Sequence, residues 1–272
     1  MPSLPPTTRN PPRPSLQRRA IAFSSPREVP AVNPYLTTTA AAYGLLAGAQ
    51  LPLAAYRLSV PPEQPWRTAC PAGHPLPALL AGPGRCRDCQ AAYGPRLAAV
   101  SVITGVVCAA LALAVGSRPE LAVWLLLAPV GVLMAMVDRA VHRLPDVLTL
   151  PTTAGCLVTL GLATLLPGSA GSWITALLGA LTTVVLYFIL FVINPSGLGF
   201  GDVKLSATVG LALGWYGWTA VFEGVAAGLL LAAGYAGVLL VLRRASRDTA
   251  LPLGPFMLAG ALLGICTGGL AA

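Results

Sequence analysis

The chain has 272 residues, of which 56% are hydrophobic and 10% charged, and its formal net charge is +8. With a mean hydropathy of +0.74, this composition excludes an ordinary water-soluble domain. Apolar runs of about 20 residues, the length needed to cross roughly 30 Å of hydrocarbon, recur along the chain. In a membrane protein an excess of arginine indicates the orientation of the chain in the membrane rather than nucleic-acid binding. We therefore expect membrane lipids, and no nucleic acid, as partners.

Residues 1–35 are rich in Pro, Ser, Thr and Arg and predict a disordered tail. The pair Arg18-Arg19 suggests a twin-arginine signal, but the next apolar segment starts too far downstream for one. A first transmembrane helix is predicted over residues 36–58. It ends at Tyr56-Arg57-Leu58, where tyrosine and arginine suit a membrane interface.

Residues 59–96 form a polar, proline-rich loop on the predicted cytoplasmic side. It contains Cys86-x-x-Cys89, whose spacing lets two thiolates share one tetrahedral zinc ion, and the upstream segment Cys70-Pro-Ala-Gly-His74. A reducing compartment disfavours a disulfide in this loop. The other three cysteines lie within apolar segments, where we expect buried free thiols.

Seven more membrane spans are predicted after this loop, within a transmembrane domain at 97–272. The sixth and seventh spans of the chain are separated only by Gly-Trp-Tyr-Gly-Trp and Glu223. The chain is thus expected to be an all-α, polytopic membrane protein with about eight transmembrane helices. After the first, these cover about 97–116, 121–137, 147–166, 172–193, 203–220, 221–242 and 253–271.

Basic residues concentrate in the loops after the first, third, fifth and seventh predicted spans, whereas the opposite loops carry only Arg118. The positive-inside rule places the basic loops in the cytoplasm and both termini outside. The five arginines of the tail argue the other way. Either the tail is exported despite its charge, or the true start lies downstream of Met1.

Two acids stand at span ends on the predicted cytoplasmic side. Asp138 follows the third span, and Asp202 follows the glycine-rich stretch 197–201. This stretch alone is equally well explained as a turn in which Asp202 caps the next helix. A carboxylate at a membrane boundary is costly to keep, however. Two of them around one water would share a proton, so that the ionised acid activates water and the protonated acid polarises a peptide carbonyl.

The sequence lacks the residues that serine, cysteine and H-E-x-x-H metalloprotease mechanisms require. A serine or cysteine nucleophile needs a base, and the chain has only two histidines, His74 and His142. His142 stands between Arg139 and Arg143, where a solvated side chain or a phospholipid contact is expected. An H-E-x-x-H metalloprotease motif is absent from the sequence.

Two segments resemble the signatures of the bacterial type IV prepilin leader peptidases. Gly199-Phe200-Gly201-Asp202, followed by Val203-Lys204-Leu205, is similar to their G-x-G-D motif. Asp138, then Leu144-Pro145-Asp146 and Leu148-Thr149-Leu150-Pro151, is similar to their first motif. The segment from Tyr43 to Leu58 also resembles the family's first helix. The resemblance covers the chain from about residue 42 to its C-terminus.

The resemblance implies a membrane aspartic endopeptidase with Asp138 and Asp202 as the catalytic pair. Such an enzyme cuts a short basic leader from prepilin or pseudopilin precursors, at the cytoplasmic face of the bacterial inner membrane. Asp146 is expected to form a turn rather than to catalyse. The motif residues that support the pair are Gly199, Gly201, Lys204, Pro145 and Asp146.

The same resemblance bears on two cofactors. Cys70-Pro-Ala-Gly-His74 is similar to the family's Cys-Pro-x-Cys-Gly-His with its second cysteine lost, which implies a structural zinc site at Cys70, His74, Cys86 and Cys89. A three-ligand site and a loop without metal are the alternatives. Many family members also methylate the processed pilin with S-adenosylmethionine. This chain has Tyr93-Gly94-Pro95-Arg96 where the family has Tyr-Pro, so methylation stays open, and S-adenosylmethionine is expected only if it occurs.

Three other functions compete with this interpretation. One is a G-x-G-D protease that cuts other helices inside the membrane, although the Leu-Pro-Asp run favours the prepilin family. Another is a transporter whose two acids carry protons or cations. The third is an inactive scaffold of a secretion machine. The sequence determines neither the precursor nor the oligomeric state.

Overall fold

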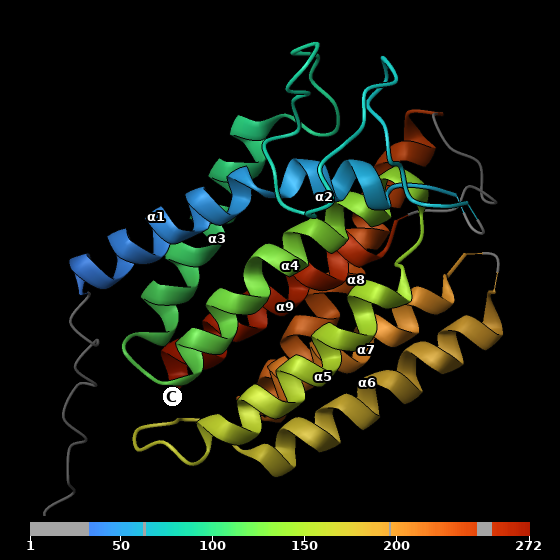
Figure 1. Cartoon of the computed structure of the whole chain (residues 1–272). Coiled ribbons are helices and arrows are strands. Elements are labelled where there is room, and N and C mark those ends of the chain that lie inside the picture. Colours follow the sequence, from blue (N-terminus) through green and yellow to red (C-terminus); the bar gives the residue numbers. More distant parts are fainter. Residues whose placement is uncertain (1–32, 62–63, 196, 244–251) are drawn as a thin grey trace, which may run out of the picture. The chain divides into compact units, whose positions relative to one another are not determined.

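The computed structural model describes residues 33–61, 64–195, 197–243 and 252–272. Within them, the regular structure consists of nine helices and two isolated β-bridges in the loop at 59–96 (Figure 1). The predicted disordered tail lies, up to residue 32, outside the described residues, as do the loop arginines Arg244 and Arg247. The helices are α1 (Pro34–Ala49), α2 (Leu51–Leu58), α3 (Leu97–Val115), α4 (Glu120–Val141), α5 (Asp146–Ala163), α6 (Trp173–Ile193), α7 (Phe200–Trp215), α8 (Trp218–Val241) and α9 (Gly254–Ala271).

Six of these helices, α3, α4, α5, α6, α8 and α9, are long and apolar enough to cross a membrane. The prediction of about eight spans is therefore wrong. The first predicted span is divided into α1 and α2 at Gln50, and Pro52 lies in the first turn of α2, where its fixed φ suits a helix start. The 16 residues of α7 rise only about 24 Å, less than the roughly 30 Å of a hydrocarbon core.

The predicted boundary between the sixth and seventh spans, at residues 220 and 221, is also wrong. Helix α7 ends at Trp215 and α8 begins at Trp218. Gly217 between them has φ +98°, a conformation that glycine adopts without the steric cost of a Cβ. The glycine thus sets the turn, and Glu223 lies inside α8.

Helix α7 is the centre of the packing. It contacts α5, α6, α8 and α9, and most of its side chains are buried. The crossing with α6 is close: a Cβ on Gly179 would lie 2.6 Å from the Gly210 carbonyl oxygen and 2.9 Å from Gly214 Cα. Small residues allow such close approach between membrane helices. The helix that carries Asp202 is therefore firmly embedded, although it is short.

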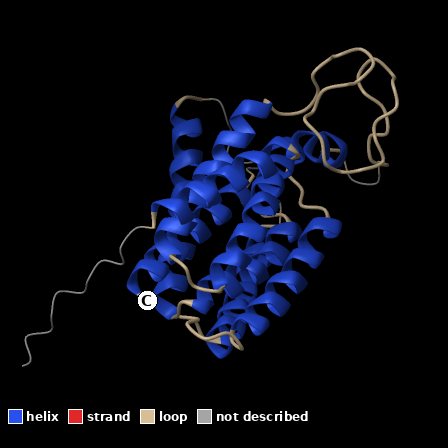
Figure 2. Cartoon of the chain, turned by 60° about the vertical axis from the view of Figure 1, so that its left-hand side comes forward, coloured by secondary structure: helices blue, strands red, loops and turns tan. Residues whose placement is uncertain are grey.

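The loop at 59–96 emerges from one end of the helices (Figure 2). A small cavity of about 150 Å³ joins it to the turn between α4 and α5. Its lining includes Trp66 from the loop, Leu58 from α2, Val141 at the end of α4, and Arg143 and Pro145 from the turn. The loop and the α4–α5 turn are therefore neighbours.

Candidate active site

Asp138 and Asp202 lie on different helices and line one cavity of about 280 Å³. Asp138 is in the last turn of α4, and Asp202 is in the first turn of α7. Both side chains are buried, with 4% and 6% of their surface exposed. The structure thus brings together two carboxylates that are 64 residues apart in the sequence (202 minus 138).

The Asp202 carboxylate also caps its own helix. Its Oδ2 accepts a hydrogen bond from the Gly199 N–H at 3.1 Å, and the Asp202 N–H donates to the Gly199 carbonyl at 3.0 Å. The first bond is the acidic half of a capping box. Glycine has no side chain to supply the other half, and the backbone bond from the Asp202 N–H to the Gly199 carbonyl takes its place. One Asp202 side chain therefore both caps α7 and lines the cavity. The first glycine of the G-x-G-D motif holds its carboxylate in place through the backbone N–H.

Asp138 is held from a different part of the chain. Its Oδ2 accepts a hydrogen bond from the Gly254 N–H, at the start of α9, at 3.0 Å. Among the residues that the structure describes, neither Asp138 Oδ1 nor Asp202 Oδ1 accepts a further protein hydrogen bond. Each acid is thus fixed through one oxygen and has the other for water or substrate.

The second glycine of the motif allows a close contact between the two motifs. A Cβ on Gly201 would lie 3.0 Å from Leu144 Cβ and 3.2 Å from the Leu144 nitrogen. Leu144 is buried and packs in a cluster with Val203 and Leu205 of α7. The leucine of the Leu-Pro-Asp segment therefore anchors the α4–α5 turn against the start of α7.

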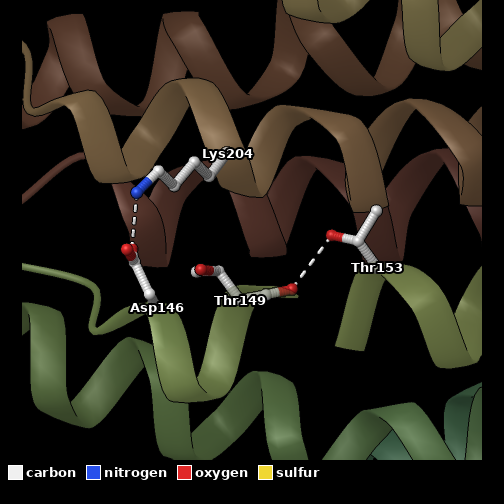
Figure 3. A network of polar contacts seen from close by, with 4 residues as sticks. All are labelled: Asp146, Thr149, Thr153 and Lys204. Atoms are coloured by element: carbon white, nitrogen blue, oxygen red, sulfur yellow. Dashed lines mark hydrogen bonds and ion pairs between the residues drawn. The ribbon is translucent and has the colours of Figure 1, made fainter. Parts of the chain in front are cut away.

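Pro145 and Asp146 begin α5. Pro145 is the N-cap residue with extended backbone, and Asp146 is in the first helical turn. Figure 3 shows Asp146 pointing toward Lys204 of α7, with 2.6 Å between Asp146 Oδ1 and Lys204 Nζ. Further along α5, Thr153 donates to the Thr149 carbonyl at 3.0 Å. The prediction that Asp146 forms only a turn missed this ion pair.

The loop at 59–96 brings four candidate metal ligands together. One ligand atom from each of Cys70, His74, Cys86 and Cys89 lies within 4.8 Å of all the others. Cys70 Sγ is 3.6 Å from His74 Nδ1 and 3.9 Å from Cys89 Sγ. Two sulfurs bound to one tetrahedral zinc at 2.3 Å lie about 3.8 Å apart. The spacing and the ligand types of the cluster therefore fit a tetrahedral zinc ion.

Two tight turns build this cluster. The Cys70 N–H donates to the His74 carbonyl at 2.8 Å, and the Cys86 N–H donates to the Ala91 carbonyl at 2.9 Å. Each ligand pair thus sits in its own small hairpin. A backbone hydrogen bond from Cys89 lowers the pKa of the Cys86 thiol, whereas burial and the neighbouring thiols raise the pKa of Cys89. Within this pair the thiolate that binds metal is therefore favoured at Cys86. All six cysteines are free thiols. Of the three expected to be buried within the spans, Cys108 and Cys156 are buried and Cys266 is half-buried.

Sequence reasoning missed two residues: one that contacts Asp138, and one buried acid that lies outside the cavity. Gly254 was one; the only signal for it is the Gly-Pro pair at the start of the last span. The other is Glu120, which is fully buried at the start of α4 and accepts from the Ala170 N–H at 3.3 Å. Glu120 does not line the cavity of the two aspartates. His142, for which a solvated side chain or a phospholipid contact was expected, is the C-cap residue of α4 and does line the cavity of the two aspartates.

These features define a multi-pass helical membrane protein with two buried acids in one cavity beside a Cys/His loop. Residues 122–242 match the model of the type IV leader peptidase family. The chain belongs to this family, as its motifs indicated.

Proteins named prepilin leader peptidase/N-methyltransferase are similar to the chain over most of its length. The one from Burkholderia pseudomallei (strain K96243) is 34% identical over 225 residues, which cover 76% of this chain and 67% of the relative. The one from Pseudomonas aeruginosa is 32% identical over 218 residues, covering 75% and 71%. The Aeromonas hydrophila protein is 31% identical over 216 residues, covering 74% and 70%. No solved structure matches the chain significantly.

Proposed function

We propose that this protein is a membrane aspartic endopeptidase that removes the short basic leader from type IV prepilin or pseudopilin precursors. The observation that carries the proposal is the cavity shared by Asp138 and Asp202, in a chain that belongs to the type IV leader peptidase family. A protease of other membrane helices and a proton-coupled transporter fit the family less well.

In the proposed reaction the two aspartates share one proton. Two buried carboxylates that face one cavity resist simultaneous ionisation, so one acid is ionised and the other protonated. The ionised acid takes a proton from a water molecule as that water attacks the scissile carbonyl. The protonated acid donates a hydrogen bond to the carbonyl oxygen, where negative charge develops. As the C–N bond breaks, the acid that took the proton from water donates it to the leaving amine, and the pair returns to its starting state with one proton. The backbone donors Gly199 and Gly254 hold the carboxylates in place for both steps.

The site is proposed to face the cytoplasm. The arginines beside the spans concentrate in the loops at this end, which the positive-inside rule assigns to the cytoplasm. A basic leader resists translocation for the same reason, so the precursor's cleavage site would stay on that side. The membrane in question would be the bacterial inner membrane, because the relatives are bacterial proteins.

Zinc bound by Cys70, His74, Cys86 and Cys89 is proposed to stabilise the loop. The loop has a small apolar cluster of its own, formed by Cys70, Cys86, Tyr93 and Leu53 of α2. A metal ion would add the cross-link that so small a core lacks. The relatives are also named for an N-methyltransferase activity. If this chain has it, the methyl donor would be S-adenosylmethionine.

The proposal is tested by co-expressing the chain with a precursor that carries a basic leader, a glycine and an apolar helix. The wild-type chain should shorten the precursor, and mass spectrometry of the product should place the cut after the glycine. A separate mass increase of one methyl group would report methylation. A precursor that stays uncut beside inserted wild-type chain would contradict the peptidase function.

A further inference from the structure

Gly254 and Asp138 are in contact although 116 residues separate them in the sequence. We propose that Gly254 is a positioning residue for Asp138, acting through its backbone N–H and through its lack of a side chain. The inference rests on the proposed function, because it assigns Gly254 a role in holding one of the two catalytic acids.

The Gly254 N–H is available because of its place in α9. Gly254 is the first residue of the helix, and the first four N–H groups of a helix have no partner within it. This N–H donates to Asp138 Oδ2 at 3.0 Å in a buried environment. The helix N-terminus also carries partial positive charge, which favours a carboxylate there. The start of α9 thus orients Asp138 and stabilises its ionised form.

The missing side chain is as important as the N–H. A Cβ on Gly254 would lie 2.9 Å from Asp138 Oδ2, 3.2 Å from its Cγ and 3.4 Å from its Cβ. The first distance is shorter than Cβ contacts in proteins, so the carboxylate or the helix would have to move. Any residue other than glycine would therefore displace either Asp138 or the start of α9.

The start of α9 has little room to retreat from Asp138. Met257, one turn further, is buried and packs in the cluster of Met134, Leu144 and Val203, and Leu253 packs against the same cluster. Pro255 fixes the backbone at the second helical position. The strain from a side chain at position 254 would fall on Asp138, which sits at the end of α4 beside the cavity.

Gly254 does not line the cavity of the two acids. Displacing Asp138 should therefore slow the chemical step and leave precursor binding unchanged. A 1 Å displacement of a catalytic group can lower a rate about 100-fold. We expect Gly254→Ala to lower kcat at least about tenfold, with KM within about twofold of wild type.

The matched control is Gly131→Ala, on the helix that carries Asp138. A Cβ on Gly131 would have Leu258 Cδ2 as its nearest neighbour, at an ordinary contact distance of 3.6 Å. Purified wild-type, Gly254→Ala and Gly131→Ala proteins are compared in nanodiscs with a synthetic precursor. Gly131→Ala should retain wild-type kcat and KM.

A thermal double-mutant cycle keeps the inference testable if Gly254→Ala folds poorly. Asp138→Ala removes the carboxylate that the new methyl group would strike. Gly254→Ala should therefore lower Tm clearly in the wild-type chain and much less in the Asp138→Ala chain. Equal lowering in both backgrounds would show that the glycine acts without Asp138.

The two proposals fail in different ways. A wild-type chain that cuts no precursor would overturn the peptidase function and, with it, the catalytic role of this contact. An active wild type together with a Gly254→Ala variant of normal kcat would overturn the positioning role alone. A Gly254→Ala variant whose KM rises while kcat holds would also overturn it.

Discussion

Lys204 Nζ lies 2.6 Å from Asp146 Oδ1, so an ion pair joins the G-x-G-D segment on α7 to the Leu-Pro-Asp segment at the start of α5. Both residues line the cavity of Asp138 and Asp202. The pair is partly exposed, with 27% of the lysine and 60% of the aspartate side chain accessible. It therefore acts at the rim of the cavity, whereas the two buried acids form its interior.

Asp146→Asn should retain most of the cleavage activity. An exposed ion pair contributes about 0.2–1 kcal/mol, and the amide oxygen of asparagine can still accept a hydrogen bond from Lys204. We expect the cleavage rate to fall less than about fivefold, measured on purified protein at saturating precursor. A loss as large as that of Asp138→Asn would assign Asp146 a part in the chemistry.

Gly201→Ala should impair the site through packing. The added methyl group would come within 3.0–3.2 Å of Leu144, and overpacking of a core costs about 1–3 kcal/mol. We expect cleavage to fall about tenfold or more. Gly155→Ala on α5 is the control, because a Cβ there meets no atom within 4 Å, and it should keep normal activity. Normal cleavage by Gly201→Ala would contradict the close contact of the two motifs.

Purified protein should contain about one zinc ion per chain, held by three cysteines and one histidine. Cys86→Ser should lose the metal, whereas Cys266→Ser, which changes a free thiol inside α9, should retain it. Because the ligands bind as thiolates, zinc content should also fall as the pH is lowered. Elemental analysis measures this, and metal-free wild-type protein purified without chelator would contradict the zinc site.

Loss of the metal should lower the stability of the protein without lowering the cleavage activity of the folded fraction. The metal cluster is in the loop at 59–96, and none of its ligands lines the cavity of the aspartates. Cys86→Ser should therefore lower Tm or the yield of folded protein, while the folded fraction still cuts the precursor.

A thiol reagent that cannot cross membranes should leave Cys86 and Cys89 unlabelled in intact cells, even when a zinc ligand is removed by Cys70→Ser, and should label them after lysis of the variant cells. A cysteine introduced by Ser169→Cys, in the loop between α5 and α6, should label from outside. The two positions lie at opposite ends of the spans in the proposed orientation, which the arginines beside the spans support. Labelling of the Cys loop from outside, with position 169 silent, would invert the orientation.

The sequence was sufficient to predict most of the helical segments, because long apolar runs are a strong signal. It failed where a helix is interrupted or shortened without losing its apolar character. The break at Gln50 and the end of α7 at Trp215 fall inside apolar stretches, so hydropathy alone did not indicate them. Gly217, with its positive φ, was the better marker of the second break.

The site was predictable only in part, for a similar reason. Asp138 and Asp202 were identifiable because they lie in two segments that resemble the motifs of the leader peptidase family, and the cysteine spacing indicated a metal cluster. The contact of Asp138 with Gly254 was not, since a backbone N–H leaves no residue signature in the sequence. Long-range backbone contacts depend on how α4 and α9 pack, which local patterns do not encode.

The cleavage rates of the Asp138→Asn and Asp202→Asn proteins test the central claim most directly. Glu120→Gln is the matched control, because Glu120 is an equally buried acid outside the cavity, and its amide can still accept from the Ala170 N–H. With equal amounts of folded protein in nanodiscs, each aspartate variant should cut a synthetic precursor at least about 100-fold more slowly than wild type. Glu120→Gln should cut it at a rate close to wild type. Cleavage by Asp202→Asn or Asp138→Asn at a rate close to wild type would contradict the account.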